Sequence, residues 1–518
     1  MSFTECIALA LFDWHHSTFC LPLIKQSMHP HGSLILRGPI CSIDRLPNEL
    51  LSTIFFFAID QHCHDELNAC TISPTTISHI CHRWRQVALA TGNLWTNIVL
   101  TYPTSNEQVI RTLTWLSRSK NYPLDILLDF RDPDWDWEGE ETHGFRWADM
   151  EAVLRLLLPS AARWRTFELL TDTWAPIFVF LFRTQKLGPA FENLEKLHLA
   201  RCNAYFARKG QFFEPTALGQ HLPLFGGAVV AVPHLREVML TGVHIDWSAA
   251  PLANLTKLEL KYQAADVMPT VRQFTQILAQ CPNIEVLAIV GRGPQFTTNE
   301  EVRGSAAVHG GSAEAVVSRA LRGTVKLARV TQFTFGFVDV NYAIQLLSLF
   351  DLPALCDLNL EDVSASLRHQ PPDDASPLLD WIIDTPRDSP PDIDDGVNAM
   401  STFHWPFSPA QLHTLALHSI HAPLSAFVRL YNACTGLREL RLCDVEDFAV
   451  EALETAAAPK NPAGVCGTPR ADILPRLQTL FVRGADEQLF SRVVRTRAPD
   501  LDALFEGSTL NEYTDDDY

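Results

Sequence analysis

Hydrophobic and polar residues follow two different patterns along the chain, and the first of them is helical. From Ile43 to Ile59, the stretch IDRLPNELLSTIFFFAI predicts a helix that begins at Pro47, where the missing N–H of proline costs nothing. Its apolar arc covers roughly 220°, about twice the stripe of an ordinary surface helix. Either the rest of its domain surrounds this helix, or a second protein covers the extra face.

A second helix is predicted from the stretch SPTTISHICHRWRQVALATGNLW. Ser73 is a candidate N-cap, Pro74 suits the first helical position, and Gly92 is placed to end the helix. Helical spacing is kept by Ile77, Ile80, Cys81, Trp84, Val87 and Ala88. Residues 43–100 are therefore a predicted small helical domain, preceded by a poorly ordered leader at residues 1–42.

From residue 101 onward, strand-like and helix-like stretches alternate. EQVIRTLTWLSRS and DMEAVLRLLLPSAARW have helical periodicity, whereas YPLDILLDF and WRTFELL have the pattern of strands. The acidic, aromatic stretch RDPDWDWEGEETHGFRW is a predicted loop. Its tryptophans either form an exposed recognition loop or, as we expect, pack onto the first repeats. Residues 101–190 are expected to link the helical domain to the repeats.

A short pattern, apolar–x–x–apolar–x–apolar, then recurs ten times, with the last copy truncated. The copies begin at Leu194, Leu235, Leu255, Ile284, Val330, Leu355, Leu412, Leu437, Leu477 and Leu501. Most spacings match the 20–29 residues of a leucine-rich repeat, and helical stretches fill several gaps. Such units must stack to bury their faces, which predicts a solenoid over residues 191–508. The alternative is an ordinary α/β domain with chance apolar spacing.

Three further segments lie outside this pattern. Residues 291–323, rich in Gly and Ala, and residues 364–408, rich in Pro and Asp, are predicted loop insertions. Residues 509–518 are a predicted disordered acidic tail.

Composition and charge exclude several classes of protein. A formal charge of −19 argues against binding to a phosphate backbone, so no nucleic-acid partner is expected. No apolar run reaches the roughly 18 residues of a membrane span, and the first residues lack the basic region of a secretory signal. The scattered cysteines are typical of reduced thiols. We expect a soluble protein of the cytoplasm or nucleus with no membrane partner.

No residue pattern indicates catalysis or a cofactor. His62, Cys63, His64 and Cys70 are the residue types that bind zinc, but no CxxC-type pair is present, so we expect no metal. The chain has no G-x-S-x-G elbow, no P-loop and no G-x-G-x-x-G at a strand–helix junction. We therefore expect neither catalytic residues nor enzyme activity.

The order LPNELLSTIF, ISHICHRWRQVA and LWTNI resembles the F-box, a short three-helix module. The repeats that follow resemble the degenerate leucine-rich repeats of fungal F-box-like proteins. Two departures stand out. Residues 60–73 form a longer connection than is usual, and of the residues eight past each first apolar residue only Cys202 fits the usual Asn or Cys position.

The resemblance implies an α/β fold in which a three-helix F-box module precedes an irregular leucine-rich-repeat solenoid. It also implies that the chain is the substrate-recognition subunit of an SCF (Skp–cullin–F-box) ubiquitin ligase. The F-box would bind a Skp-type adaptor, and through it the cullin and RING subunits. The adaptor-binding residues would be Leu46, Pro47, Leu50, Leu51, Ile54, Phe55, Ile80, Cys81, Trp84, Leu94 and Trp95. A leucine-rich-repeat scaffold that does not deliver substrates for ubiquitination is the alternative.

In leucine-rich repeats, the strands line one face, and alternate side chains point toward it. The predicted substrate-binding residues are accordingly Lys257, Glu259, Lys261, Val286, Ala288, Val290, Asp357, Asn359 and Glu361. The three central residues are apolar, and two interpretations are open. They form an anchor site on the binding face, or the insertion at residues 291–323 folds over and buries them.

Overall fold

The computed structural model of the chain describes residues 42–60, 74–135, 143–186, 190–202, 222–227, 232–296, 325–364, 373–383, 407–454, 473–497 and 501–507. Nearly all of the predicted leader, the acidic tail and most of both insertions lie outside these residues, as do His62, Cys63, His64 and Cys70. The chain divides into two compact units, residues 1–198 with 230–234 and residues 199–229 with 235–518. This division falls within a strand, whereas the sequence placed boundaries near residues 100 and 190.

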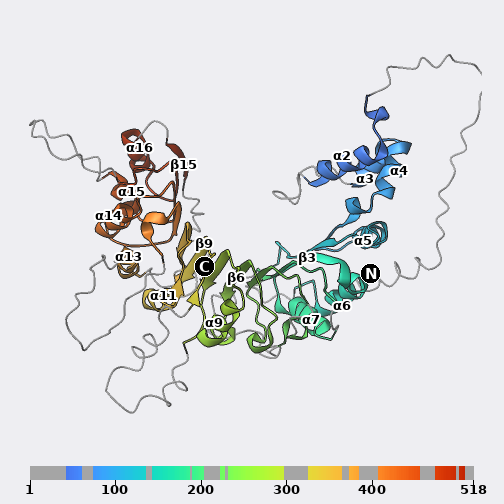
Figure 1. Cartoon of the computed structure of the whole chain (residues 1–518), viewed down its shortest axis with the longest axis horizontal. Coiled ribbons are helices and arrows are strands. Elements are labelled where there is room, and N and C mark those ends of the chain that lie inside the picture. The colour runs from blue at the N-terminus through green and yellow to red at the C-terminus, as the bar shows by residue number, and fades with distance from the viewer. Residues whose placement is uncertain are drawn as a thin grey trace, which may run out of the picture. The chain divides into compact units, whose positions relative to one another are not determined.

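The first unit begins with helices and continues into alternating strands and helices (Figure 1). In chain order its described elements are η1 (Ser42–Arg45), α2 (Asn48–Asp60), α3 (Pro74–Ile80), α4 (His82–Ala90), η2 (Gly92–Trp95), β1 (Asn97–Thr101), α5 (Asn106–Arg118), β2 (Leu124–Phe130), α6 (Trp147–Leu157), η3 (Leu158–Arg163), β3 (Trp164–Thr171) and α7 (Trp174–Thr184). We call η1, α2–α4 and η2 the helical segment. The strands and helices predicted between residues 101 and 190 are confirmed.

The predicted single helix after Ser73 is wrong, because the structure divides it into α3 and α4. Cys81 separates them with an extended backbone, and its sulfur accepts a hydrogen bond from the N–H of Trp84 at 3.4 Å. Cys81 is therefore the N-cap of α4 and not a residue of an apolar helix face. α4 ends at Ala90, with Thr91 as its C-cap, and Gly92 begins η2.

The second unit repeats a strand followed by a helix or a 3₁₀ turn. Its described elements are β4 (Lys196–Arg201, across the division), η5 (Leu224–Gly227), β5 (Glu237–Thr241), η7 (Trp247–Ala249), β6 (Lys257–Gln263), η8 (Ala265–Val267), α9 (Val271–Ala279), β7 (Val286–Gly291), β8 (Val325–Lys326), β9 (Gln332–Phe337), α11 (Val340–Leu347), β10 (Phe350–Asp351), β11 (Asp357–Asp362), α13 (Ser376–Ile383), η10 (Pro409–Gln411), β12 (Thr414–His418), α14 (Leu424–Ala433), β13 (Glu439–Cys443), α15 (Asp447–Glu454), β14 (Thr479–Arg483), α16 (Glu487–Thr496) and β15 (Asp502–Glu506). All ten copies of the apolar pattern lead into a strand, so the ten predicted strands are confirmed.

The fold is mixed α/β, and its main sheet has thirteen strands in chain order, β1–β7, β9 and β11–β15, while β8 and β10 form a separate pair. A recurring turn precedes many strands. The N–H of the first apolar residue of a copy donates to the carbonyl three residues earlier, as in Leu437 to Cys434 and Leu477 to Leu474. This turn fixes the register in which each strand enters the sheet.

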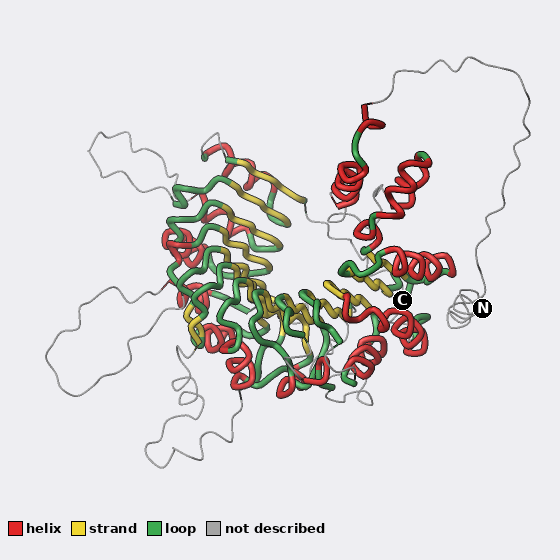
Figure 2. Tube along the Cα trace, turned by 45° about the vertical axis from the view of Figure 1, so that its right-hand side comes forward, coloured by secondary structure: helices red, strands yellow, loops and turns green. Residues whose placement is uncertain are grey.

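In the second unit, the helices cover one side of the sheet, and no described helix lies on the other side (Figure 2). The apolar strand positions face the helices and are buried; Leu258, Leu260 and Leu358 are no more than 2% exposed. Alternate residues of the same strands form the opposite surface, which we call the polar face. Burial of one side of each strand against helices leaves the polar face available to solvent or to a partner.

None of the helices in the described residues is both long enough and apolar enough to cross a membrane.

Candidate functional site

The helical segment has its own hydrophobic core. Leu51, Phe55, Leu94 and Trp95 lie in that core together with Ile77, Val87 and Ala88. Leu46 and Trp84 pack against it, and the Trp84 ring lies 4.7 Å from that of Phe55. Leu51, Phe55, Leu94 and Trp95, predicted to bind the adaptor, are therefore core residues, because each is at most 3% exposed. Their burial leaves any docking surface to their neighbours.

Large apolar side chains on the outside of α2 remain exposed. Leu50, Ile54 and Phe57 are 51%, 43% and 56% exposed, and their i, i+4, i+7 spacing places them on one helix face. We call these three residues the α2 stripe. Ile80 and Leu89 are also exposed. The predicted residues Pro47 and Cys81 are exposed without being large apolar groups. Phe57 was missing from the predicted site, although its spacing from Leu50 is a sufficient signal.

Arg83 fastens the beginning of α2 to α4. Its guanidinium donates to the Asn48 side-chain oxygen at 3.2 and 3.1 Å and also to the carbonyl of Leu46. This link joins residues 35 and 37 positions apart in the sequence. It holds α2 in a fixed position relative to α4, so the α2 stripe is presented on a rigid support.

The polar face of the second unit carries the residues predicted to bind a substrate, and the parallel register aligns them in rows. Lys257 pairs with Val286, Glu259 with Ala288 and Lys261 with Val290 in adjacent strands. Asp357, Asn359 and Glu361 of β11 lie two strands further along, beyond Gln332, Thr334 and Gly336 of β9. The structure thus brings the nine predicted residues onto three strands, β6, β7 and β11, with only β9 between β7 and β11.

On β6 the charged residues of the polar face are paired with one another. The Glu259 carboxylate lies 2.9 Å from the Lys257 ammonium and 2.7 Å from that of Lys261. Burial acts to raise the pKa of Glu259, but the hydrogen bonds from the two lysines outweigh it and lower the pKa below its usual range. On β13, Glu439 is paired in the same way with Arg441.

The predicted apolar anchor site is wrong for two of its three residues. Ala288 and Val290 are only 2% and 3% exposed, while Val286 is partly exposed. Val290 packs against Val338, Val363 and Tyr262, so described residues of this unit already bury it. The insertion expected to cover the patch, residues 291–323, lies almost wholly outside the described residues. A side chain enclosed in this way is not an anchor for a partner.

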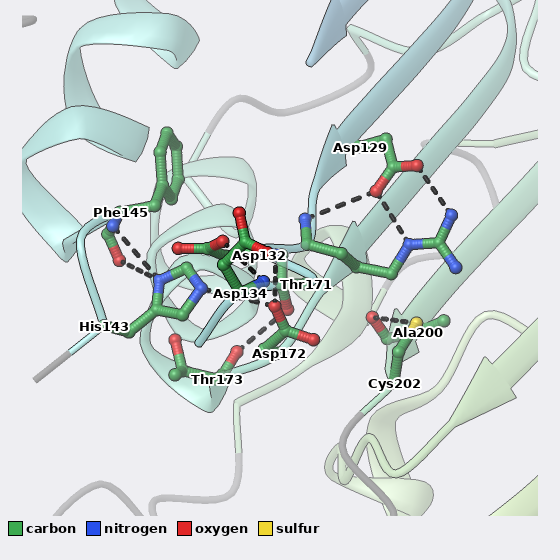
Figure 3. Close-up of polar contacts among 11 residues, drawn as sticks. Asp129, Asp132, Asp134, His143, Phe145, Thr171, Asp172, Thr173, Ala200 and Cys202 are labelled. Carbon is green, nitrogen blue, oxygen red and sulfur yellow. Dashed lines mark hydrogen bonds and ion pairs between the residues drawn. The ribbon is translucent and has the colours of Figure 1, made fainter. Parts of the chain in front are cut away.

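A second polar cluster lies in the first unit, where β2 and β3 end (Figure 3). The buried His143 ring places Nε2 3.2 Å from the Asp172 carboxylate, and Nδ1 3.2 Å from the carbonyl of Phe145. Asp172 also accepts the N–H of Asp132 at 2.7 Å. Burial acts to lower the pKa of His143, but the bonds to Asp172 and Phe145 outweigh it and raise the pKa above 6.5.

Replacing His143 with glutamine is expected to reduce stability more at pH 6 than at pH 9. The pKa of His143 is higher in the folded chain than its value of 6.5 in the unfolded chain. The contribution of His143 to stability is therefore complete below pH 6.5 and disappears as the pH rises through the pKa of the folded chain. Melting temperatures of the wild type and of His143→Gln between pH 5.5 and 9 measure this. His234→Gln, at an exposed position of the same unit, is the control. A difference that does not depend on pH would contradict the assignment.

Among the described residues, no group of three or more His, Cys, Asp or Glu is placed to hold a metal ion. His418 and Cys443 are neighbours in register on the polar face. Burial raises the pKa of Cys443, which disfavours its thiolate. Burial, together with the nearby Arg483 and Arg441, lowers the pKa of His418, which disfavours its imidazolium form. Both shifts therefore oppose a thiolate–imidazolium pair.

No protein-family model matches the chain, and no curated protein matches it. The described residues present two distinct surfaces: an apolar stripe on a small helical segment, and a polar sheet face supported by repeated strands and helices. Both are surfaces suited to protein partners.

Proposed function

We propose that the chain is the substrate-recognition subunit of an SCF-type ubiquitin ligase. In this proposal the helical segment is an F-box that binds a Skp-type adaptor, and the repeated strands form a leucine-rich-repeat solenoid whose polar face captures a protein substrate. The chain itself would be non-catalytic, with ubiquitin transferred by the RING subunit and the conjugating enzyme. It would act in the cytoplasm or nucleus and lead to ubiquitin-dependent degradation of its substrate.

The observation that carries the proposal is the α2 stripe. Each of its three side chains is more than two-fifths exposed, and none of them belongs to the hydrophobic core of the helical segment or packs against it. A helix face with apolar residues at i, i+4 and i+7 is the form of surface that binds in a partner's hydrophobic groove. The stripe therefore supports docking to an adaptor, and the separate polar face supports capture of a substrate.

Affinity purification of the tagged full-length chain tests the proposal. We expect the adaptor and the cullin to be recovered together with the chain. Recovery of the adaptor without the cullin would replace this function by that of a scaffold. If neither were recovered, the proposed function would be wrong. Point variants are preferable to deletion of residues 43–100, because Trp95 packs edge to face on Trp115 of α5 and the deletion would expose that surface.

A further inference from the structure

Strand β11 presents three hydrogen-bond acceptors on the polar face: Asp357, Asn359 and Glu361. They are alternate residues of one strand, so their side chains share the face at intervals of about 6.6 Å. Asn359 has small register partners on both sides, Thr334 on β9 and Ala416 on β12, whereas Glu361 has Gly336 on β9 and His418 on β12. The small partners leave room above β11 for a side chain from another molecule.

Two of these acceptors lack a donor among the described residues. The side-chain oxygen of Asn359 is buried and accepts no hydrogen bond. The Glu361 carboxylate is half-buried, and burial raises its pKa, while Lys261 acts on it only through its charge and in the opposite direction. The Lys261 ammonium is already paired with Glu259 at 2.7 Å. An acceptor that is shielded from water and has no donor destabilises the folded chain. A ligand that supplies a donor removes this cost, which makes its free energy of binding more favourable.

An aromatic side chain stands beside these acceptors. The β6–β7 register shifts between Lys261 and Gln263, and the extra residue, Tyr262, has a left-handed φ of 52°. A β-bulge of this kind re-aims a side chain, and a tyrosine in this conformation is strained. The Tyr262 ring packs on Val290, Val338 and Val363. Burial, followed by the charge of Glu361, raises the pKa of Tyr262. Val363, a member of the cluster on which the ring packs, lies two residues after Glu361.

In register, Val290 of β7 and Gly336 of β9 lie between Lys261 of β6 and Glu361 of β11, so the position directly next to Glu361 on β9 has no side chain. A Cβ atom at Gly336 would lie only 2.6 Å from a methyl carbon of Val290, so a glycine is needed there. The site therefore has an aromatic wall, an apolar floor and two acceptors that lack donors.

We infer that this site on β11 binds an arginine side chain of a protein partner. The guanidinium would stack on the Tyr262 ring and donate to the Glu361 carboxylate and the Asn359 oxygen, since its planar fork of donors serves both neighbouring acceptors. The inference rests on the proposed function in one respect, namely that the polar face captures a protein. It adds the chemical class of the recognised group.

The charged groups around the site allow a cation to enter. Glu259 is paired with both Lys257 and Lys261, and Arg483 donates to Asp444 at 2.8 Å. His418, the register partner of Glu361, has a pKa lowered by burial and by Arg483, so its ring is uncharged near neutral pH. The two lysines of β6 share the carboxylate of Glu259, and His418 is uncharged. Their remaining positive charge is therefore smaller than the negative charge of Asp357 and Glu361, which favours the entry of a cation.

A titration of the full-length chain with a short capped peptide, Gly-Gly-Arg-Gly-Gly, tests the inference. The readout is the methyl NMR signals of Val290 and Val338, which lie against Tyr262. We expect saturable shifts with the arginine peptide and at least about tenfold weaker binding of the citrulline peptide, which has the same shape without the charge. The lysine peptide should bind several-fold more weakly than the arginine peptide. Equal binding of the citrulline or the lysine peptide would overturn the assignment.

Variants locate the peptide on this site. Glu361→Gln is expected to weaken binding about tenfold or more and Tyr262→Leu about threefold or more, the ranges for a charge-assisted bond and for stacking on an aromatic ring. Glu237→Gln, at a partly exposed position of the same face on β5, is the matched control and should bind like the wild type. Unchanged binding of Glu361→Gln would overturn the inference.

The melting temperature of Glu361→Gln gives a second, independent check. Because burial raises the pKa of Glu361, its ionised form costs stability at pH 7.5, and that cost disappears as the pH falls toward the usual glutamate value. The variant should therefore melt at or above the wild-type temperature at pH 7.5. A lower melting temperature would mean that the carboxylate has a structural partner, which contradicts the site. Adaptor recovery is expected to be unaffected by this variant, so failure here and failure of the proposed function are distinguishable.

Discussion

Replacement of both Leu50 and Ile54 with aspartate is expected to reduce adaptor binding by about 100-fold or more and to leave the melting temperature of the free chain nearly unchanged. Both side chains are exposed in the free chain, at 51% and 43%, so a carboxylate there remains in water. In a complex, however, each aspartate would be buried against an apolar groove without a partner, which costs several kcal/mol. A pull-down with purified adaptor, together with thermal unfolding, measures both effects.

The matched control is Ile110→Asp on α5. Ile110 is 54% exposed and belongs to the same unit, but it lies outside the helical segment. It should bind the adaptor like the wild type. Equal loss of binding in the control and in the double variant would mean that added charge, and not the α2 stripe, is responsible. Undiminished binding of the double variant would refute the docking surface. Leu51 is unsuitable for this test because it is wholly buried.

The strands of the second unit could be predicted from the sequence because each carries its own alternation and its own preceding turn. Leu437, for example, begins the pattern LRELRL, and its N–H closes the turn that leads into β13. Such information is local and requires no knowledge of other strands. The helical stretches predicted in the gaps between copies include VRQFTQILAQCPN and LSAFVRLYNAC, which form α9 and α14. They could be predicted for the same reason, since a single helix contains the whole apolar period.

The break between α3 and α4 could not be predicted in this way. Ile77, Cys81 and Trp84 fit one continuous helix as well as two short ones, so periodicity alone does not separate these cases. The decisive contact is the hydrogen bond from the Trp84 N–H to the Cys81 sulfur, and cysteine is not among the usual N-cap residues. Periodicity also does not show which part of a wide apolar arc is covered, so the predicted adaptor-binding set combined core residues of α2 such as Phe55 with exposed residues such as Ile54.

The polar face shows a similar limit. Alternation correctly placed Asn359, Glu361 and Val290 on one side of the sheet, because a parallel register keeps equivalent residues in a row. It could not reveal that Val290 is buried, since the residues that cover it come from the strand ends and from a bulge. Tyr262 was not predicted as a site residue, because a shift of register inside β6 has no signature in the spacing of apolar residues.

The second large effect is expected for Trp95→Ala, which should lower the free energy of unfolding of the first unit by about 3–5 kcal/mol. The Trp95 side chain is fully buried in the core of the helical segment, and its indole N–H donates to the carbonyl of Ala88 at 2.9 Å. Its ring also meets Trp115 edge to face at 5.7 Å, and the Arg118 guanidinium lies 4.4 Å from the ring centre. Because Trp115 and Arg118 belong to α5, one side chain joins the helical segment to the first strand–helix repeat.

Urea unfolding of three variants separates the contributions of Trp95. Trp95→Phe should lose only about 1 kcal/mol or somewhat more, because the ring still fills the core and the Ala88 carbonyl keeps the N–H of Thr91 as a donor at 3.2 Å. Trp147→Ala, at a position that is 61% exposed, should be nearly neutral and serves as the control. If Trp95→Ala were as mild as Trp147→Ala, the helical segment would not depend on α5, and the predicted helical domain at residues 43–100 would be expected to fold without the rest of the chain. The shared packing of Trp95 and Trp115 leads us to expect the opposite, namely that this fragment is markedly less stable than the same residues within the whole chain.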